Sequence, residues 1–303
     1  MMRPHRGVAV VMALGVVALA AIAVSAMLTT QNIWARERQL EADHAQAHVL
    51  LQSGVDWARA VLSDDRRLTV VDHPREPWAL RLPPMPVDNG ELAGHIEDQQ
   101  GLFNLNGLVQ GGKANPVQVQ RYRRLLSLLG LPPALAATLV DWMDPDGEEL
   151  PAGAEDGYYA SLPTPYLAAN RPLADIAELA LVKGYGEDVR ARLAPFVTAL
   201  PGATAINVNT APAEVLCAVI DGLDLDAART VVNLRERTYF RDYADFAARL
   251  PRGVQATASD LRVTSSYFLT RVRVTIGGAE ARGMAMLSRN DAGWPAILWR
   301  RYE

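Results

Sequence analysis

An uninterrupted apolar segment near the N-terminus constrains this chain more than any other feature. Residues 8–28 carry no charge, and Ser25 is their only hydroxyl side chain. As an α-helix these 21 residues extend about 31 Å, which matches the hydrocarbon core of a bilayer. Arg3 and Arg6 precede the segment, so the positive-inside rule predicts a cytoplasmic N-terminus and an exported remainder. A conventional signal peptide, with the small residues 23–26 as its cleavage site, is the weaker alternative because its apolar region covers only about 7–15 residues.

The residues around Gly7 resemble a processing site. Arg6-Gly7 followed by Val8 is similar to the prepilin cleavage site of type IV pilins and type II secretion pseudopilins. The resemblance implies that a prepilin peptidase removes residues 1–7 and that Val8, the first mature residue, is N-methylated. Most members carry glutamate at the fifth mature position, where an intramembrane carboxylate is costly and pairs with a neighbouring subunit. Met12 stands there in this chain, as is typical of the large minor pseudopilins of the K family.

Composition narrows the function further. The chain has 303 residues and a net charge of −4, so it has no global basic field that would hold nucleic acid. Cys217 is its only cysteine, which excludes an intrachain disulfide. This residue lies in an apolar helical segment without a nearby histidine, so we interpret it as a buried structural thiol rather than a nucleophile.

The membrane helix is predicted to continue outside the bilayer. Residues 29–62 include no proline, and their apolar side chains recur at steps of three and four residues, as on one face of a helix. The charged tetrapeptide at residues 64–67 is predicted to end it. The proline-rich residues 72–90 then predict an extended connection.

Alternating patterns predict a small sheet at both ends of the remaining sequence. Residues 91–105 alternate in part, and residues 267–276 alternate throughout, with Phe268 and Val272 on one face and Arg271 on the other. Gly277-Gly278 is a hairpin signal, followed by predicted strands at 281–287 and 294–299. Because residues 106–255 have a helical pattern, we predict an α+β protein: a pilin-like domain from residues 63–105 and 256–303, interrupted by an all-α domain at 106–255.

The predicted helical domain contains a weak internal repeat. The motif Phe103-Asn-Leu-Asn106 is echoed by Ile206-Asn-Val-Asn209, and each is followed by two helices with a Gly-Leu turn between them. These units resemble helix-hairpin-helix (or SAM-like) modules, with Asn209 or Thr210 as the expected helix cap. DNA-binding modules use a second turn glycine, which is Pro132 or Asp224 here, so we expect packing units without DNA.

The strongest chemical signal is an acidic loop. Residues 125–170 contain no lysine or arginine but seven carboxylates, at positions 141, 144, 146, 148, 149, 155 and 156. Such crowding raises carboxylate pKa values unless a cation neutralises it. Asp144-Pro-Asp146-Gly147 has the carboxylates and turn of a hard-cation loop, and oxygen ligands favour calcium over zinc or copper. A solvated acidic loop is the alternative; nearby aromatic side chains are expected to pack around the loop.

Several segments together resemble the K family of type II secretion minor pseudopilins, in the expected order: residues 96–106, 141–147, 153–159, 166–173 and 206–212. The resemblance implies a pilin-like sheet with an inserted calcium-binding helical domain, a structural role at the pseudopilus tip and no enzymatic activity. It implies assembly with the I and J pseudopilins, with H as a further candidate, and with the major pseudopilin and the inner-membrane assembly platform. The calcium-ligand candidates are Asp144, Asp146, Glu155 and Asp156, with Asp141 and Asn209 as secondary ones.

The resemblance also implies a single-pass inner-membrane protein with a periplasmic C-terminal domain that moves to the pseudopilus tip. Two rival hypotheses stay open at this stage. One is a membrane-anchored DNA-binding or uptake protein that uses the helix-hairpin-helix units. The other is a membrane-anchored hydrolase that uses the acidic loop, although no nucleophile–base pair is evident in the sequence.

Overall fold

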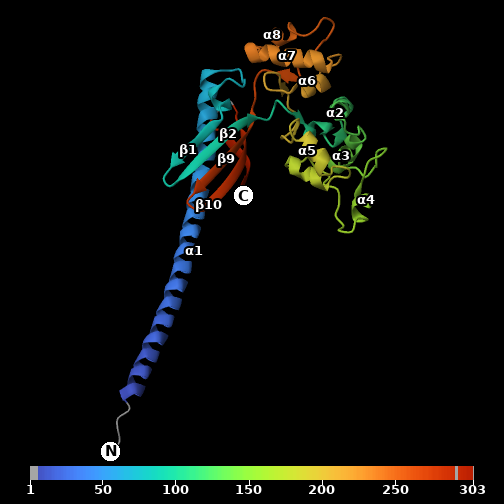
Figure 1. Cartoon of the computed structure of the whole chain (residues 1–303). Helices are drawn as coiled ribbons and strands as arrows, with labels where there is room; N and C mark the ends of the chain where they lie inside the picture. Colours follow the sequence, from blue (N-terminus) through green and yellow to red (C-terminus); the bar gives the residue numbers. More distant parts are fainter. Residues whose placement is uncertain (1–5, 291–292, 303) are drawn as a thin grey trace, which may run out of the picture.

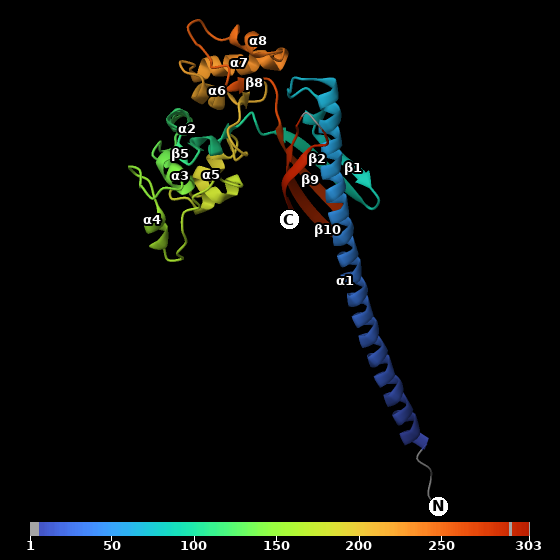
Figure 2. The same cartoon turned by 180° about the vertical axis from the view of Figure 1, so that it is seen from behind.

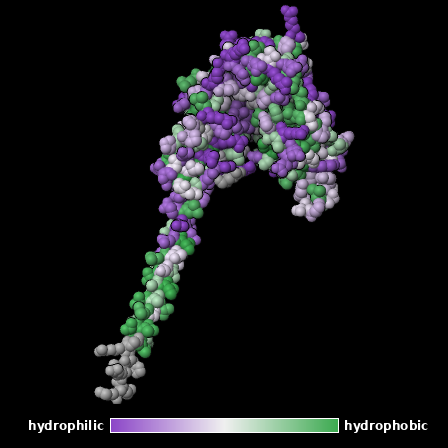
Figure 3. Space-filling view, viewed as in Figure 1, coloured by the Kyte–Doolittle hydropathy of each residue, from purple (hydrophilic) through white to green (hydrophobic). Residues whose placement is uncertain are grey.

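A single long helix organises the molecule. The computed structural model describes residues 6–290 and 293–302, and helix α1 (Arg6–Leu68) has 63 residues. It is the one helix of the described residues that is long and apolar enough to cross a membrane, and its apolar stem stands clear of the rest of the molecule (Figure 3). Most of the predicted leader, residues 1–5, lies outside the described residues. Helix α1 continues past the predicted boundary at Leu62 and ends at Leu68, directly after the charged tetrapeptide that is predicted to end it. Asp65 in this last turn is buried in an ion pair with Arg289.

An antiparallel sheet of five strands packs beside the outer half of α1 (Figure 1). The strand order is β1-β2-β9-β10-β11, with bounds β1 (Leu82–Val87), β2 (Gly90–Asp98), β9 (Tyr267–Ile276), β10 (Ala279–Ser288) and β11 (Ala296–Tyr302). A two-residue turn joins β9 to β10, with Ile276 opposite Ala279 and Gly277 at φ +52°. The alternation predicted for residues 267–276 is therefore confirmed as strand β9.

Two strand predictions need correction. Strand β1 lies within the predicted extended connection, because an edge strand tolerates prolines that lack a backbone N–H. Strand β2 ends at Asp98 rather than near residue 105. The chain turns there, and Phe103 joins a separate parallel pair of strands.

Helix α1 covers one face of the sheet. Ala47, Leu51 and Val55 on α1 are buried in one cluster with Phe268 and Val272 on β9. The approach is close: a Cβ added at Gly54 would lie 2.7 Å from Cγ1 of Val272. Leu269 on the opposite face of β9 is also buried, because it packs against Leu200 of the helical part.

The helical part is inserted between β2 and β9. Its helices are α2 (Pro116–Leu128), α3 (Leu135–Met143), α4 (Asp156–Ala160), α5 (Glu187–Leu193), α6 (Ala213–Val219), α7 (Leu225–Arg237) and α8 (Tyr243–Ala247). Short 3-10 helices are η1 (Pro77–Ala79) before the sheet, and η2 (Leu105–Leu108) and η3 (Ile176–Leu181) within the insertion. Figures 1 and 2 show this part to one side of the sheet, on the side away from α1.

The inserted part is not purely helical, and its core is wider than predicted. Three short strand pairs brace it: β3 (Phe103–Asn104) with β6 (Val197–Thr198), β4 (Val109–Gln110) with β5 (Lys113–Ala114), and β7 (Ile206–Asn207) with β8 (Leu261–Arg262). Its core also takes in Phe103 and Leu261, which lie outside the predicted limits of 106–255.

The repeated Asn-x-Asn motifs explain how the two units are held. The amide group of Asn106 bonds the backbone N–H and C=O of Leu173, 67 residues further along. Asn209 bonds both backbone groups of Phe240 in the same way. The prediction that Asn209 or Thr210 caps the next helix is wrong, since Pro212 occupies the cap position of α6 without a side-chain cap.

Candidate metal centre

The acidic loop brings together three of the predicted ligands. The loop begins at Asp144, directly after α3, and ends at Glu155, immediately before α4. Asp144, Asp146 and Glu155 each offer a carboxylate oxygen, and these oxygens all lie within 4.8 Å of one another. Asp144 and Glu155 are buried, whereas Asp146 is exposed, so the cluster opens to solvent on one side.

Asp141 anchors this loop from beneath. Its side chain is fully buried in the last turns of α3, where Oδ2 accepts hydrogen bonds from the amides of Leu150 (3.2 Å) and Ala154 (2.8 Å). Gly153 packs directly on it, because an added Cβ would lie 1.8 Å from Oδ2 of Asp141. The glycine is therefore required by the close approach of backbone to carboxylate.

Three buried carboxylate oxygens lack a hydrogen-bond donor. Among the described residues, Oδ1 of Asp141, Oδ1 of Asp144 and Oε1 of Glu155 have no partner. Buried polar atoms in native proteins are almost always satisfied. These three oxygens, gathered where the loop meets α3, form a donor set that a hard cation could satisfy.

The electrostatics of the loop agree with this geometry. Burial, reinforced by repulsion from Asp146 and Asp141, raises the pKa of Asp144 to about 6. Burial and the surrounding carboxylates raise the pKa of Glu155 to about 7. Burial also raises the pKa of Asp141, although its two backbone hydrogen bonds oppose the shift. A bound divalent cation would reverse these shifts by favouring the ionised forms.

Lys183 supports the loop without pairing with a carboxylate. Its Nζ donates a hydrogen bond of 2.8 Å to the carbonyl of Gly153 and lies 4.6 Å from the centre of the Tyr158 ring. Lys183 was not predicted from the sequence, because it lies outside the cation-free stretch. The expected aromatic packing is present: the ring centres of Trp142 and Tyr159 are 5.0 Å apart.

Besides Asp141, two predicted ligands lie outside the three-residue cluster. Oδ1 of Asp156 accepts a hydrogen bond from the amide of Ala168, and Asp156 is not part of the three-residue cluster. Asn209 lies in the second repeat unit, and both of its side-chain polar groups bond the backbone of Phe240. Asn209 is therefore not available as a ligand.

The other chemical candidates have structural surroundings. Cys217 is buried and donates to the carbonyl of Leu223. Asp224 accepts a hydrogen bond from Ala227 at the start of α7, so a carboxylate occupies the helix end where a DNA-binding module would receive phosphate.

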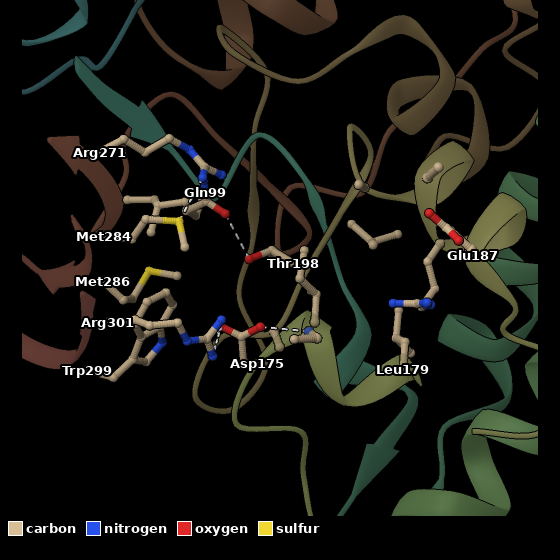
Figure 4. A pocket seen from close by; sticks show the side chains of 18 residues that line it. Gln99, Asp175, Leu179, Glu187, Thr198, Arg271, Met284, Met286, Trp299 and Arg301 are labelled. Carbon is tan, nitrogen blue, oxygen red and sulfur yellow. Dashed lines mark hydrogen bonds and ion pairs between the residues drawn. The ribbon is translucent and has the colours of Figure 1, made fainter. Parts of the chain in front are cut away.

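A groove of about 440 Å³ separates the helical part from the outer face of the sheet. Met284, Met286 and Trp299 form one wall, and Leu179 lies on the other (Figure 4). Asp175 and Arg301 pair across it at 3.6 Å.

Comparisons with known proteins agree on one family. Residues 101–202 and 206–264 match models described as Type II secretion system (T2SS), protein K. Type II secretion system protein K of Pseudomonas aeruginosa is 36% identical over 99% of this chain and 93% of the relative. Its counterpart from Klebsiella pneumoniae is 31% identical over 98% and 96%. A chain of the GspK–GspI–GspJ complex from enterotoxigenic Escherichia coli superposes with a TM-score of 0.79 and 29% identity, covering 88% of this chain and 99% of that one.

Proposed function

Because the chain belongs to the protein K family of the type II secretion system and is thus a minor pseudopilin, we propose that it is the tip subunit of the pseudopilus, assembled with the I and J pseudopilins. The observation that carries this proposal is the similarity to a chain of the GspK–GspI–GspJ complex, which covers 99% of that chain. H is a further candidate partner. The role is structural, without a catalytic reaction.

The membrane helix suggests how the subunit is stored. The apolar residues 8–28 anchor it in the inner membrane with the C-terminal part in the periplasm. Prepilin peptidase cuts after Gly7, and Val8 becomes the methylated first residue. The helix then leaves the bilayer and packs against the corresponding helices of I and J, on the assembly platform.

The inserted domain favours an end position in the fibre. It stands to one side of the sheet, well away from the line of α1 (Figure 2). In a fibre whose subunits pack through their long helices, an insertion of this size in the middle would obstruct its neighbours. At the tip it has room.

We further propose that calcium binds the acidic loop through Asp144, Asp146 and Glu155, with Asp141 supporting them. The orphan buried oxygens and the oxygen-only donor set fit a hard cation of irregular coordination. When bound, calcium neutralises the cluster and fixes the path of the loop between α3 and α4. Asp156 acts from outside the cluster by holding the amide of Ala168.

A direct calcium titration tests this proposal. The full chain in detergent, stripped by chelator, is titrated with calcium by calorimetry, with magnesium as the competing cation. Saturable calcium binding and a higher melting temperature support the site. Unchanged melting with and without chelator, together with no heat of binding, would contradict it.

A further inference from the structure

The junction between the sheet and the inserted part is built on one carboxylate. Oδ2 of Asp98, at the end of β2, accepts hydrogen bonds from Asn207 (2.9 Å), Thr210 (2.6 Å) and Ser265 (2.6 Å). Oδ1 accepts the amide of Gln100 at 2.8 Å. Gln100 and Ser265 lie on the two segments that connect the sheet with the inserted part, and Asn207 and Thr210 lie in the second repeat unit. Asp98 therefore ties together every segment that joins them.

Further hydrogen bonds connect these residues with the end of α1. The amide of Ser265 donates to Oδ2 of Asp72 at 2.7 Å, and Asn207 donates to the carbonyl of Asp72 at 3.1 Å. Arg289 bonds Asp72 and also Asp65 on α1, the latter at 2.7 Å. Asp65, Asp72 and Arg289 are all buried. We call these seven side chains the junction network: Asp65, Asp72, Asp98, Asn207, Thr210, Ser265 and Arg289.

Apolar contact between the two parts is small by comparison. Their separate cores meet through one cluster with three buried members among the described residues: Leu200, Leu269 and Met286. The groove keeps the rest of the two surfaces apart, bridged by the partly exposed pair Arg301–Asp175. A single ion pair open to solvent contributes little, whereas a largely buried network fixes geometry strongly.

We propose that the junction network is a rigid coupling that makes α1 and the inserted helical domain move as one body. An axial shift of α1, such as its passage from the bilayer into a fibre, is then transmitted to the helical domain rather than absorbed at the two chain crossings. The groove stays open because the network, not the groove walls, sets the angle between the parts. This coupling is independent of calcium binding.

Distance measurements between spin labels test the coupling in the full chain in detergent. Cysteines replace Gln52 on α1 and Gln120 on α2, both exposed, and Cys217 is replaced by alanine. The parent should give a single narrow distance. Thr210→Val with Ser265→Ala removes two of the donors to Asp98, and we expect loss of the single narrow distance with both cores still folded.

Asp175→Asn is the matched control, because it weakens the ion pair across the groove while its amide oxygen can still accept from Ala177, as Asp175 does. It should leave the narrow distance unchanged. The proposal would be overturned if the network variant kept a single narrow distance between the spin labels. It would also be overturned if only the Asp175→Asn control gave a broadened distribution of distances. If the double variant does not fold, Thr210→Val alone carries the test. Faster hydrogen exchange at the amides of Gln100 and Ser265 is the second readout, and parent-like protection there counts against it.

Discussion

At the scale of single residues, the acidic loop is defined by which carboxylate oxygens already have donors. Oδ2 of Asp141 has two backbone donors, while its Oδ1 has none. Glu155 lies just before α4, and one of its carboxylate oxygens is within 4.8 Å of one from Asp144. This division between anchoring oxygens and free oxygens is what favours a proposed calcium site over a solvated charged surface.

Neutralising one cluster residue should weaken calcium binding. We expect Glu155→Gln to lower the calcium affinity roughly tenfold or more, about 1.4 kcal/mol, because a buried charged ligand is lost. Glu148→Gln makes the same chemical change at an exposed position of the same loop and should have little effect. Calorimetric titration of both variants decides the matter, and equal losses would mean that the loop attracts calcium only by net charge.

Without calcium, the stability of the protein should depend on pH through this cluster. The pKa of Glu155 is raised from 4.5 to about 7, and that of Asp144 from 3.8 to about 6. Ionising a group whose pKa is raised by folding costs the folded state. In chelator, these two groups therefore cost the folded state least below pH 4, where both are protonated. The melting temperature should fall as the pH rises from 4 to 7. Saturating calcium should remove this fall; the same slope with calcium would argue against the site.

Gly153 should not tolerate a side chain. Gly153→Ala places a Cβ 1.8 Å from Oδ2 of Asp141, and we expect a cost of about 1–3 kcal/mol from overpacking. Gly147→Ala in the same loop meets no atom within 4 Å and serves as the control. Urea unfolding compares the two, and equal stabilities would show that the loop yields freely.

At the scale of elements, α1 supplies five of the fourteen buried residues in the core cluster of the pilin-like part. Leu51 is fully buried against the sheet, while Val49 is 62% exposed. Leu51→Ala should therefore cost about 2–5 kcal/mol, whereas Val49→Ala should stay within about 0.5 kcal/mol. Urea unfolding in detergent measures both. A reversed order would mean that a different face of α1 meets the sheet.

Local patterns in the sequence predicted the elements that are governed by periodicity. Strand β9 alternates because one face meets α1, and that alternation is visible in residues 267–276. Strand β1 was missed because its prolines are tolerated only at an edge, and edge position depends on the whole sheet. The pairing of Asp65, near the end of α1, with Arg289 could not be predicted from local patterns, because Arg289 lies 224 residues away.

The candidate metal site was predicted in part because most of its residues lie close together in the sequence. Asp144, Asp146 and Glu155 are neighbours in sequence, and the structure brings them together. Asn209 was included by family resemblance, yet its amide is used on Phe240. Lys183 and the junction network could not be predicted, because their partners come from segments that only the tertiary fold brings together.

At the scale of the whole molecule, three parts have separate tasks. The apolar part of α1 is long enough to cross a membrane, the sheet packs against the rest of α1, and the inserted domain carries the acidic loop away from the apolar stem (Figure 1). The junction network joins the last two at a fixed angle. This arrangement suits a subunit that is stored in a bilayer and then presents a large domain at the end of a fibre.

Native mass spectrometry of membrane-extracted complexes tests the central claim most directly. The full chain is co-expressed with the I and J pseudopilins of the same organism and with prepilin peptidase. The account predicts one complex with a single copy of each pseudopilin, in which this chain lacks residues 1–7 and carries one methyl group on Val8. A chain with its leader intact, or one that enters no complex with I and J, would contradict it.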